Sequence, residues 1–430
     1  MSETVSPAPK AQPTPGADDA PPPAAQPSRW RTAFRQIVHG NLLTSILSVV
    51  IALFIGAILI AASNADVQRT MGYFFARPYD GIWYIGNSVG RAYAALFQGA
   101  VINFQATSVA AALSPLADTL RQSAPLIIGG LGLGIGFRAG LFNIGGNGQI
   151  VLGAILCGYV GFAMPLPIGL HLVVAVLAAI LGGLIWGFIP GILRAKTGAN
   201  EVIVTIMLNS IAASLVAFIL RTNGAFQATP GQPRSSVVAP TAQFPSLFGW
   251  ASADWGFVIA IAVAVFTWWL MERSTLGFRL RAVGENPEAA KTAGINVSNV
   301  LMWALVISGG MLGLVAATQL LAASNPLQLS SDIAGTLGFD AITVALLGRS
   351  KPLGTVLAGL LFGAFKAGGY IMSATTGTPV DIILILESVI VLLLAAPPLV
   401  KAIFRLPDPE RRPSKRAVRK AARLAQEAVA

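Results

Sequence analysis

The stretch LLTSILSVVIALFIGAILIAA, residues 42–62, runs for 21 positions without a charged side chain. An α-helix rises ~1.5 Å per residue, so about 20 apolar residues cross a hydrocarbon layer ~30 Å thick. A run this long and this apolar predicts a helix that spans a membrane.

Similar apolar runs recur along the chain and predict an all-α, polytopic membrane protein with about ten transmembrane helices. The short eighth run and the glycine-rich start of the third are typical of half-helices or re-entrant segments, which membranes tolerate where protein or a water-filled path covers the backbone. The ten predicted spans are residues 42–62, 118–137, 146–164, 168–189, 202–221, 256–271, 299–322, 336–348, 353–373 and 381–400.

The composition of the 430 residues agrees with this class, because 54% are hydrophobic and only 11% are charged. A soluble protein has about a quarter charged residues. The net charge of +11 is compatible with nucleic-acid binding, but most basic residues lie between or beyond the apolar runs, as loop charges do in membrane proteins. We therefore expect lipid and no nucleic acid as a partner.

The distribution of basic residues predicts the orientation. With both termini on the cytoplasmic side, 22 of the 29 Lys and Arg residues fall inside and four fall in outer loops. Basic residues are retained on the cytoplasmic side, so both termini are predicted to be cytoplasmic. The four outer residues are Arg69, Arg77, Arg91 and Arg234.

Three regions are expected along the chain. Residues 1–41 are rich in Pro and Ala and predict a disordered cytoplasmic tail, because such a composition buries too little apolar surface to order itself. Residues 42–400 form the transmembrane domain, and residues 401–430 form a basic cytoplasmic tail. Residues 82–113 are moderately apolar, and we place them outside as a helix on the membrane surface, since Arg91 disfavours burial in lipid.

The rarest residues exclude several chemistries. A single cysteine, Cys157, and two distant histidines, His39 and His171, do not favour a disulfide, a zinc site or an iron–sulfur cluster. The chain has no Gly-Lys dipeptide, so a Walker A phosphate loop is excluded. No catalytic residue and no metal site are predicted, and any ATP is hydrolysed by another chain.

The longest cytoplasmic loop, residues 272–298, contains a candidate docking segment. Proline is favoured in the first turn of a helix, so Asn286-Pro287 predicts a helix start, and Glu288 suits its positive end. Gly294 permits a left-handed helix end. An ordinary solvated loop has the same spacing, and the loop alone does not decide between the two.

Two polar segments within apolar sequence are candidates for a translocation path. The segment GFRAGLFNIGGNGQIVLGA, residues 136–154, places amides among closely spaced glycines, and TGANEVIVTIMLNSIAAS, residues 197–214, repeats polar side chains every four residues on one helix face. Such groups face a path, fasten helices together, or, in the first segment, lie in a cytoplasmic turn. The candidates are Asn143, Asn147, Gln149, Glu201, Thr205 and Asn209.

Three ionisable residues are predicted inside the membrane. Asp340 lies in the short eighth span and is a further path candidate or part of an ion pair. Lys366 and Glu387 lie at similar depth on neighbouring spans, which predicts an intramembrane ion pair. A solute contact is the alternative role for the pair.

Four segments resemble the permease subunits of bacterial ABC uptake transporters for nucleosides. They are GLFNIGGNGQ (140–149), GANEVIVTIMLN (198–209), STLGFRLRAVGENPEAAKTAGI (274–295) and GFDAITVALLG (338–348), in the same order and spacing over residues 115–400. The first and third segments are shared more loosely with permeases for ribose, other simple sugars and branched-chain amino acids. The second points most specifically to the nucleoside branch.

The resemblance implies an importer complex in the bacterial plasma (inner) membrane, in which this chain is a multi-pass permease. The implied partners are a cytoplasmic ABC ATPase that holds ATP and Mg, a second homologous permease, and an extracytoplasmic solute-binding protein that delivers the nucleoside. No cofactor is expected in this chain. By motif match, the helix that docks on the ATPase includes Glu285, Asn286, Pro287, Ala289, Ala290, Gly294 and Ile295.

The chain departs from the family pattern at Asn147, where an acidic residue is usual, so the resemblance assigns no charge to that position. Two alternatives stay open: an ABC importer of ribose or another simple sugar, and an ion-coupled secondary transporter. The second would use Asp340, Lys366 and Glu387 for coupling.

Overall fold

The computed structural model describes residues 41–222, 224, 226–227, 231–247, 252–322, 327–395, 399–400 and 403–404. The predicted tails, residues 1–41 and 401–430, lie almost wholly outside this part of the chain.

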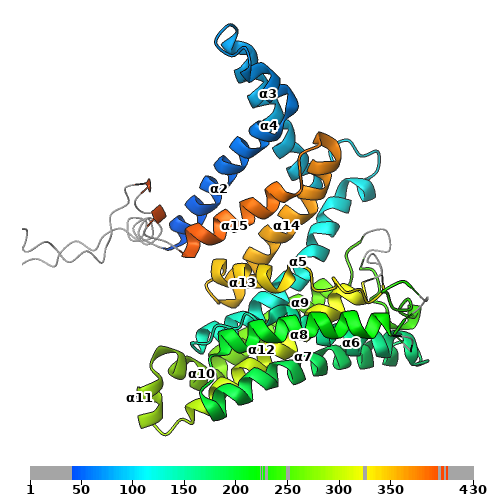
Figure 1. Ribbon diagram of the computed structural model, residues 1–430, viewed down its shortest axis with the longest axis vertical. Coiled ribbons are helices and arrows are strands. Elements are labelled where there is room, and N and C mark those ends of the chain that lie inside the picture. The colour runs from blue at the N-terminus through cyan, green and yellow to red at the C-terminus, as the bar shows by residue number, and fades with distance from the viewer. Residues whose placement is uncertain are drawn as a thin grey trace, which may run out of the picture. The chain divides into compact units, whose positions relative to one another are not determined.

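The described residues form helices, with isolated bridges and no extended strand among them (Figure 1). The helices are α2 (Asn41–Ser63), α3 (Ala65–Met71), α4 (Pro78–Ala100), α5 (Val109–Arg138), α6 (Gly146–Ala163), α7 (Leu170–Thr197), α8 (Glu201–Arg221), α9 (Trp255–Arg273), α10 (Thr275–Glu285), α11 (Pro287–Thr292), α12 (Val297–Leu320), α13 (Leu337–Leu347), α14 (Pro352–Thr376) and α15 (Asp381–Ala395), with a 3₁₀ turn at Pro240–Ala242.

Every predicted span coincides with a helix, which confirms the all-helical class. Within the described residues, seven helices are long and apolar enough to cross a membrane: α2, α6, α7, α8, α9, α12 and α14. Of the other three predicted spans, α13 has only 11 residues, α15 has 15, and α5 carries Asp118 and Arg121 within its 30 residues. The count of ten spans therefore stays a prediction.

The larger apolar core lies around α6, α7 and α12, whose backbones approach closely at glycines. A Cβ atom built on Gly183 would lie 2.0 Å from the carbonyl oxygen of Gly309, and one on Gly153 would lie 2.7 Å from the Cα of Gly313. Only glycine permits such contacts between helices. Gly309 and Gly313 therefore let α12 pack closely against α6 and α7.

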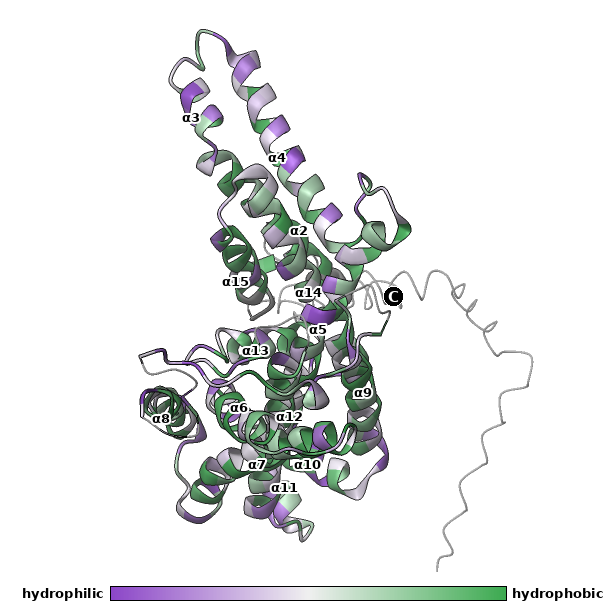
Figure 2. Cartoon of the chain, turned by 90° about the vertical axis from the view of Figure 1, so that its right-hand side faces the viewer, coloured by the Kyte–Doolittle hydropathy of each residue, from purple (hydrophilic) through white to green (hydrophobic). Residues whose placement is uncertain are grey.

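A second apolar cluster joins α2, α4, α14 and α15, and it changes the interpretation of residues 82–113. These residues mostly form α4, which does not lie alone on a surface. Ala92 is fully buried, the Tyr93 hydroxyl donates to the carbonyl of Leu53 in α2, and Gly99 packs against Ile371 in α14. Figure 2 shows hydrophilic residues concentrated on α3 and the start of α4, and apolar ones along α2 and α15.

Two chain breaks bring helix starts together inside the larger core. After α5, Gly140 adopts φ +76° and residues 141–144 are not helical before α6 begins at Gly146. The short helix α13 also begins within the protein, and a Cβ on Gly146 would lie 3.0 Å from the Cα of Gly338. The N-terminal ends of α6 and α13 therefore meet. The 11 residues of α13 agree with the half-helix interpretation of the eighth span, whereas α6, the third span, is long enough to cross a membrane.

Candidate functional site

The first turn of α13 is capped by a side chain from another helix. Its own N-cap residue, Thr336, makes no side-chain capping bond. Instead, Asn147 on α6 accepts a hydrogen bond from the Gly338 amide at 2.8 Å and donates one to the Gly335 carbonyl at 3.0 Å. The first backbone N–H groups of a helix have no partner within it. Asn147 therefore supplies the side-chain cap that Thr336 does not provide for α13.

The first turn of α6 is capped in the same way. Its N-cap residue, Gly145, has no side chain to offer. Asn209 on α8 accepts a hydrogen bond from the Gly148 amide at 2.8 Å and donates one to the Ile144 carbonyl at 2.9 Å. Two asparagines thus link α8 to α6 and α6 to α13, so the three helices meet at one polar junction.

A cavity of ≈ 550 Å³ opens beside this junction. Its size suits a small organic solute, since such sites measure ~300–1,000 Å³. Asn147 and Asn209 both border it, which places two of the predicted path residues at one cavity. The remaining lining residues are Ile144, Val151, Ile206, Ser210, Ala213, Ser331, Asp332, Ala334, Gly335 and Phe339.

Two other predicted path residues lie away from the cavity. Asn143 and Gln149 are buried, and the Asn143 amide donates to Gln149 at 3.0 Å and to Ser308 on α12 at 3.1 Å. The Asn143 side-chain oxygen accepts from the Gly145 amide at 2.9 Å. This network holds the chain break before α6 against α12, so both side chains stabilise the junction on the side away from the cavity.

The polar stripe on α8 faces the start of α6 and the end of α7. Glu201 forms an ion pair with Arg194 at 3.5 Å. Thr205 is buried, its hydroxyl donates to the Val202 carbonyl at 3.1 Å, and its side chain packs on Gly145. Of the three stripe residues, only Asn209 borders the cavity. The stripe therefore fastens helices over most of its length.

The predicted ion pair between Lys366 and Glu387 is wrong. Lys366 Nζ on α14 lies 2.8 Å from Asp340 Oδ2 on α13, and that oxygen also accepts from the Thr336 hydroxyl at 2.7 Å. Glu387 is buried on α15, and its Oε1 atom has no hydrogen-bond partner among the described residues. Equal depth on neighbouring helices does not fix which way a side chain points around the helix, and α13 is the nearer neighbour. Asp340 thus fastens the first turn of α13 to α14.

The candidate docking segment has the local structure that its sequence predicts. The Asn286 side chain accepts from the Ala289 amide at 3.1 Å, Pro287 begins α11, and Gly294 adopts φ +82°. Ala290 is buried, whereas Ala289 is exposed. The predicted helix start and helix end are confirmed, and α11 projects from the end of the bundle where α10 lies (Figure 1). Its role in docking stays a prediction.

Helix α10, next to this segment, is held on the end of α5. A Cβ built on Gly284 would lie 2.1 Å from the carbonyl oxygen of Arg138, so the two backbones touch. Glu272 lies 3.0 Å from the Arg138 guanidinium and 2.7 Å from that of Arg281. Because the chain break that positions α6 follows Arg138 directly, α10 contacts the segment that leads into the cavity.

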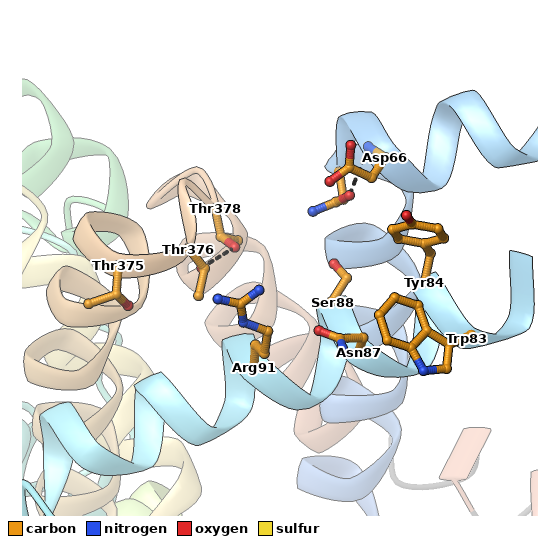
Figure 3. Close-up of a pocket in the computed structure, with 10 residues that line it drawn as sticks. Asp66, Trp83, Tyr84, Asn87, Ser88, Arg91, Thr375, Thr376 and Thr378 are labelled. Atoms are coloured by element: carbon orange, nitrogen blue, oxygen red, sulfur yellow. Dashed lines mark hydrogen bonds between the residues drawn. The ribbon is translucent and has the colours of Figure 1, made fainter. Parts of the chain in front are cut away.

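A second polar cavity, of ≈ 330 Å³, lies between α3, α4 and the end of α14. Figure 3 shows Arg91 extending from α4 toward Thr376, whose hydroxyl lies 2.7 Å from that of Thr378. Trp83 and Tyr84 line its other side. The cavity is lined by residues of α3, and Figure 1 shows α3 and α11 at opposite ends of the described helices.

The lining residues of the larger cavity that sequence reasoning missed include Ser210, Ser331, Asp332 and Phe339. Asp332 carries a usable signal, since it is the only acidic residue between Glu288 and Asp340. The residue lies in a connection between helices rather than within an apolar run. Phe339 lies within one of the resembling segments, but a phenylalanine in an apolar helix gives no signal of its own.

Residues 116–395 match the family described as branched-chain amino acid transport system / permease component. A guanosine ABC transporter permease protein of Bacillus subtilis is 35% identical over 72% of this chain and 87% of its own length. A glucose ABC transporter permease protein of Haloferax volcanii is 33% identical over 65% of this chain and 75% of its own. A nucleoside ABC transporter permease protein of Lactococcus lactis is 32% identical over 65% and 79%.

No solved structure matches this chain. The family match covers most of the described helices, from α5 to α15, and the relatives are ABC transporter permease proteins. The chain therefore belongs to the family of branched-chain amino acid transport system permease components and is a multi-pass membrane permease.

Proposed function

We propose that this chain forms the translocation path of an ABC importer for nucleosides. The supporting observation is that three resembling segments, distant in sequence, converge on one cavity. Asn147 comes from GLFNIGGNGQ, Asn209 from GANEVIVTIMLN and Phe339 from GFDAITVALLG, and all three border the cavity of ≈ 550 Å³. The named relatives that carry guanosine and nucleosides agree with this substrate class.

The importer works by alternating access, with ten spans and both termini on the cytoplasmic side. This chain makes and breaks no covalent bonds. A cytoplasmic ATPase binds at α10 and α11, an extracytoplasmic binding protein delivers solute at the opposite end, and a second permease completes the path. ATP and the loaded binding protein bind the inward-facing and outward-facing states unequally, and that difference moves the equilibrium between them.

The polar junction gives this movement a local mechanism. Each of α6 and α13 has its N-terminal turn capped by an asparagine on another helix. A shift of α10 against Arg138 acts on the chain break before α6, and through Asn147 it acts on α13. The cavity wall thereby responds to a movement that begins at the ATPase.

Uptake measurements test the substrate class. Cells that express this permease with its associated ATPase and binding protein should accumulate labelled guanosine and uridine, and deletion of either the permease or the ATPase should abolish that uptake. Ribose and galactose serve as comparison solutes, measured at the same concentrations. Gene-dependent uptake of free sugar without nucleoside uptake would overturn the proposal.

The Haloferax volcanii relative favours a simple sugar as the second candidate substrate. The polar groups at the cavity, which include Ser210, Ser331 and Asp332, suit hydroxyl-rich solutes of either class. A sugar has no base, so competition with excess adenosine separates the candidates. Adenosine should block uptake by this importer if its solute is a nucleoside, and should leave uptake unchanged if its solute is a sugar.

Ala289→Glu is expected to separate the permease from its ATPase. Ala289 is exposed on α11, and a carboxylate buried without a partner at an interface costs enough to weaken binding by more than about tenfold. Co-purification of the ATPase should be lost and uptake should fall with it, while the amount of permease in the membrane stays unchanged. Ser298→Glu, an exposed position at the start of α12, is the matched control. Normal co-purification of the ATPase with the Ala289→Glu variant would show that α11 is not the docking helix.

A further inference from the structure

The amides that border the cavity are already committed to the protein. Asn147 and Asn209 each donate one hydrogen bond to a backbone carbonyl and accept one from a backbone amide. These four bonds cap α6 and α13, so both side chains have fixed orientations and form the wall. Capping uses one of the two N–H groups and one of the two oxygen lone pairs of each amide, so groups of the cavity that the fold does not use are better placed to recognise a solute.

Asp332 is the charged group of the cavity that the fold leaves free. It is exposed, and within the described residues its carboxylate forms no ion pair and no hydrogen bond; only its backbone carbonyl is used, by the Gly335 amide at 3.1 Å. Asp332 also borders a smaller cavity of ≈ 240 Å³, together with Arg234. Asp332 is therefore common to the lining of both cavities.

Phe339 is the aromatic group of the same cavity. Its side chain is 53% exposed although it lies in the first turn of α13, and it makes no ring contact within the described part of the chain. Asn147 fixes the backbone beside it through Gly338. The backbone that carries the Phe339 ring is thus held in place, while the face of the ring is open to a solute.

We propose that Asp332 and Phe339 form a nucleoside subsite, in which the carboxylate binds the ribose 2′- and 3′-hydroxyls and the ring stacks on the base. This inference rests on the proposed function and names the groups that recognise the solute. A carboxylate accepts hydrogen bonds from two adjacent hydroxyls at once, and such bonds to a charged group are the stronger kind. Aromatic rings stack on every base with little sequence preference.

The same chemistry sets a limit on the solute. The negative charge of Asp332 repels a phosphate group, so the subsite favours nucleosides over nucleotides. Because Phe339 stacks without reading hydrogen bonds, purine and pyrimidine nucleosides are both accepted. The hydroxyls of Ser210 and Ser331, which also border the cavity, are available for the remaining polar atoms of the solute.

The test compares two solutes in the intact importer, the permease with its ATPase and binding protein. Guanosine and 2′,3′-dideoxyguanosine are each supplied at saturating concentration, so that the selectivity of the binding protein does not enter the maximal rate. Asp332→Asn should lower the maximal rate for guanosine about tenfold and change that for the dideoxynucleoside little. Phe339→Leu should lower both rates about tenfold, because both solutes carry the base.

Matched variants control for general damage. Asp381→Asn removes an exposed acid at the start of α15, and Phe218→Leu removes an exposed ring on α8 outside the cavity. Both should transport the two solutes as the unaltered chain does. The amount of each variant in the membrane is measured alongside, so that rates are compared per molecule.

Any other outcome contradicts the diol contact of Asp332, the base contact of Phe339 or the proposed function itself. Equal loss of both solutes with Asp332→Asn, or no loss, would show that the carboxylate does not bind the diol, while guanosine uptake by the unaltered chain would leave the proposed function standing. Free ribose uptake that depends on Asp332 but not on Phe339, with no nucleoside uptake, would overturn both the base contact and the proposed function.

Discussion

Lys366→Met is expected to prevent the permease from accumulating in the membrane. Lys366 lies 2.8 Å from Asp340, and Glu387 is buried nearby with an oxygen that has no hydrogen-bond partner in the part of the chain that the structure describes. Without the ammonium group, two carboxylates remain together in a region of low dielectric. Removing one partner of a buried pair costs about 3–5 kcal/mol, which is a large part of the stability of a folded protein.

The measurement is the amount of folded permease in the membrane and its thermal unfolding after purification. Lys351→Met, at an exposed position beside α14, removes the same charge and should have little effect. The double variant Asp340→Asn with Lys366→Met should recover much of the loss, because replacing both partners of a buried pair is often nearly neutral. A double variant as unstable as Lys366→Met would show that Asp340 is not the partner that matters.

Gly309→Ala is expected to destabilise the permease by about 2–3 kcal/mol, although alanine favours a helix over glycine. A Cβ at position 309 would lie 2.3 Å from the Gly183 carbonyl oxygen and 3.0 Å from the Gly187 Cα. These are backbone atoms, so relief requires α7 and α12 to separate along their interface. Gly309→Leu should abolish folding altogether.

Gly90→Ala provides the control for this effect. Gly90 also lies within a helix, α4, but a Cβ there would meet no atom within 4 Å. Its replacement by alanine should leave the free energy of unfolding unchanged or raise it by up to about 1 kcal/mol. The unfolding temperature should follow in the same direction. If Gly309→Ala behaves as Gly90→Ala does, the close contact between α7 and α12 is absent from the folded protein.

The sequence predicted the helices well because hydropathy is a local property. Each predicted span required only about 20 neighbouring residues, and the start of α11 required only the Asn286-Pro287 pair and a nearby glycine. The partners of polar side chains are different, since they depend on how helices rotate and pack. Lys366 was paired with the wrong acid for this reason, as helix depth carries no information on rotation.

The cavity was predicted only in part for the same reason. Asn147 and Asn209 stood out as amides in apolar sequence, and they do border the cavity. Their capping roles link positions 191 and 61 residues apart, which no local pattern indicates. Asp332 and Phe339 lay in an ordinary loop and an ordinary apolar turn, so only the folded chain brings them to one place.

The two capping asparagines become available at different times during synthesis of the chain. Asn209 follows Gly148 by 61 residues, so at ~5–20 residues per second the ribosome makes it about 3–12 s after the start of α6. Asn147, by contrast, precedes its partner Gly338 and is waiting when α13 emerges. Unbonded backbone groups are costly in lipid. We therefore expect the start of α6 to stay at a hydrated site of the insertion machinery until α8 is made, so that α6, α7 and α8 enter the bilayer as one unit.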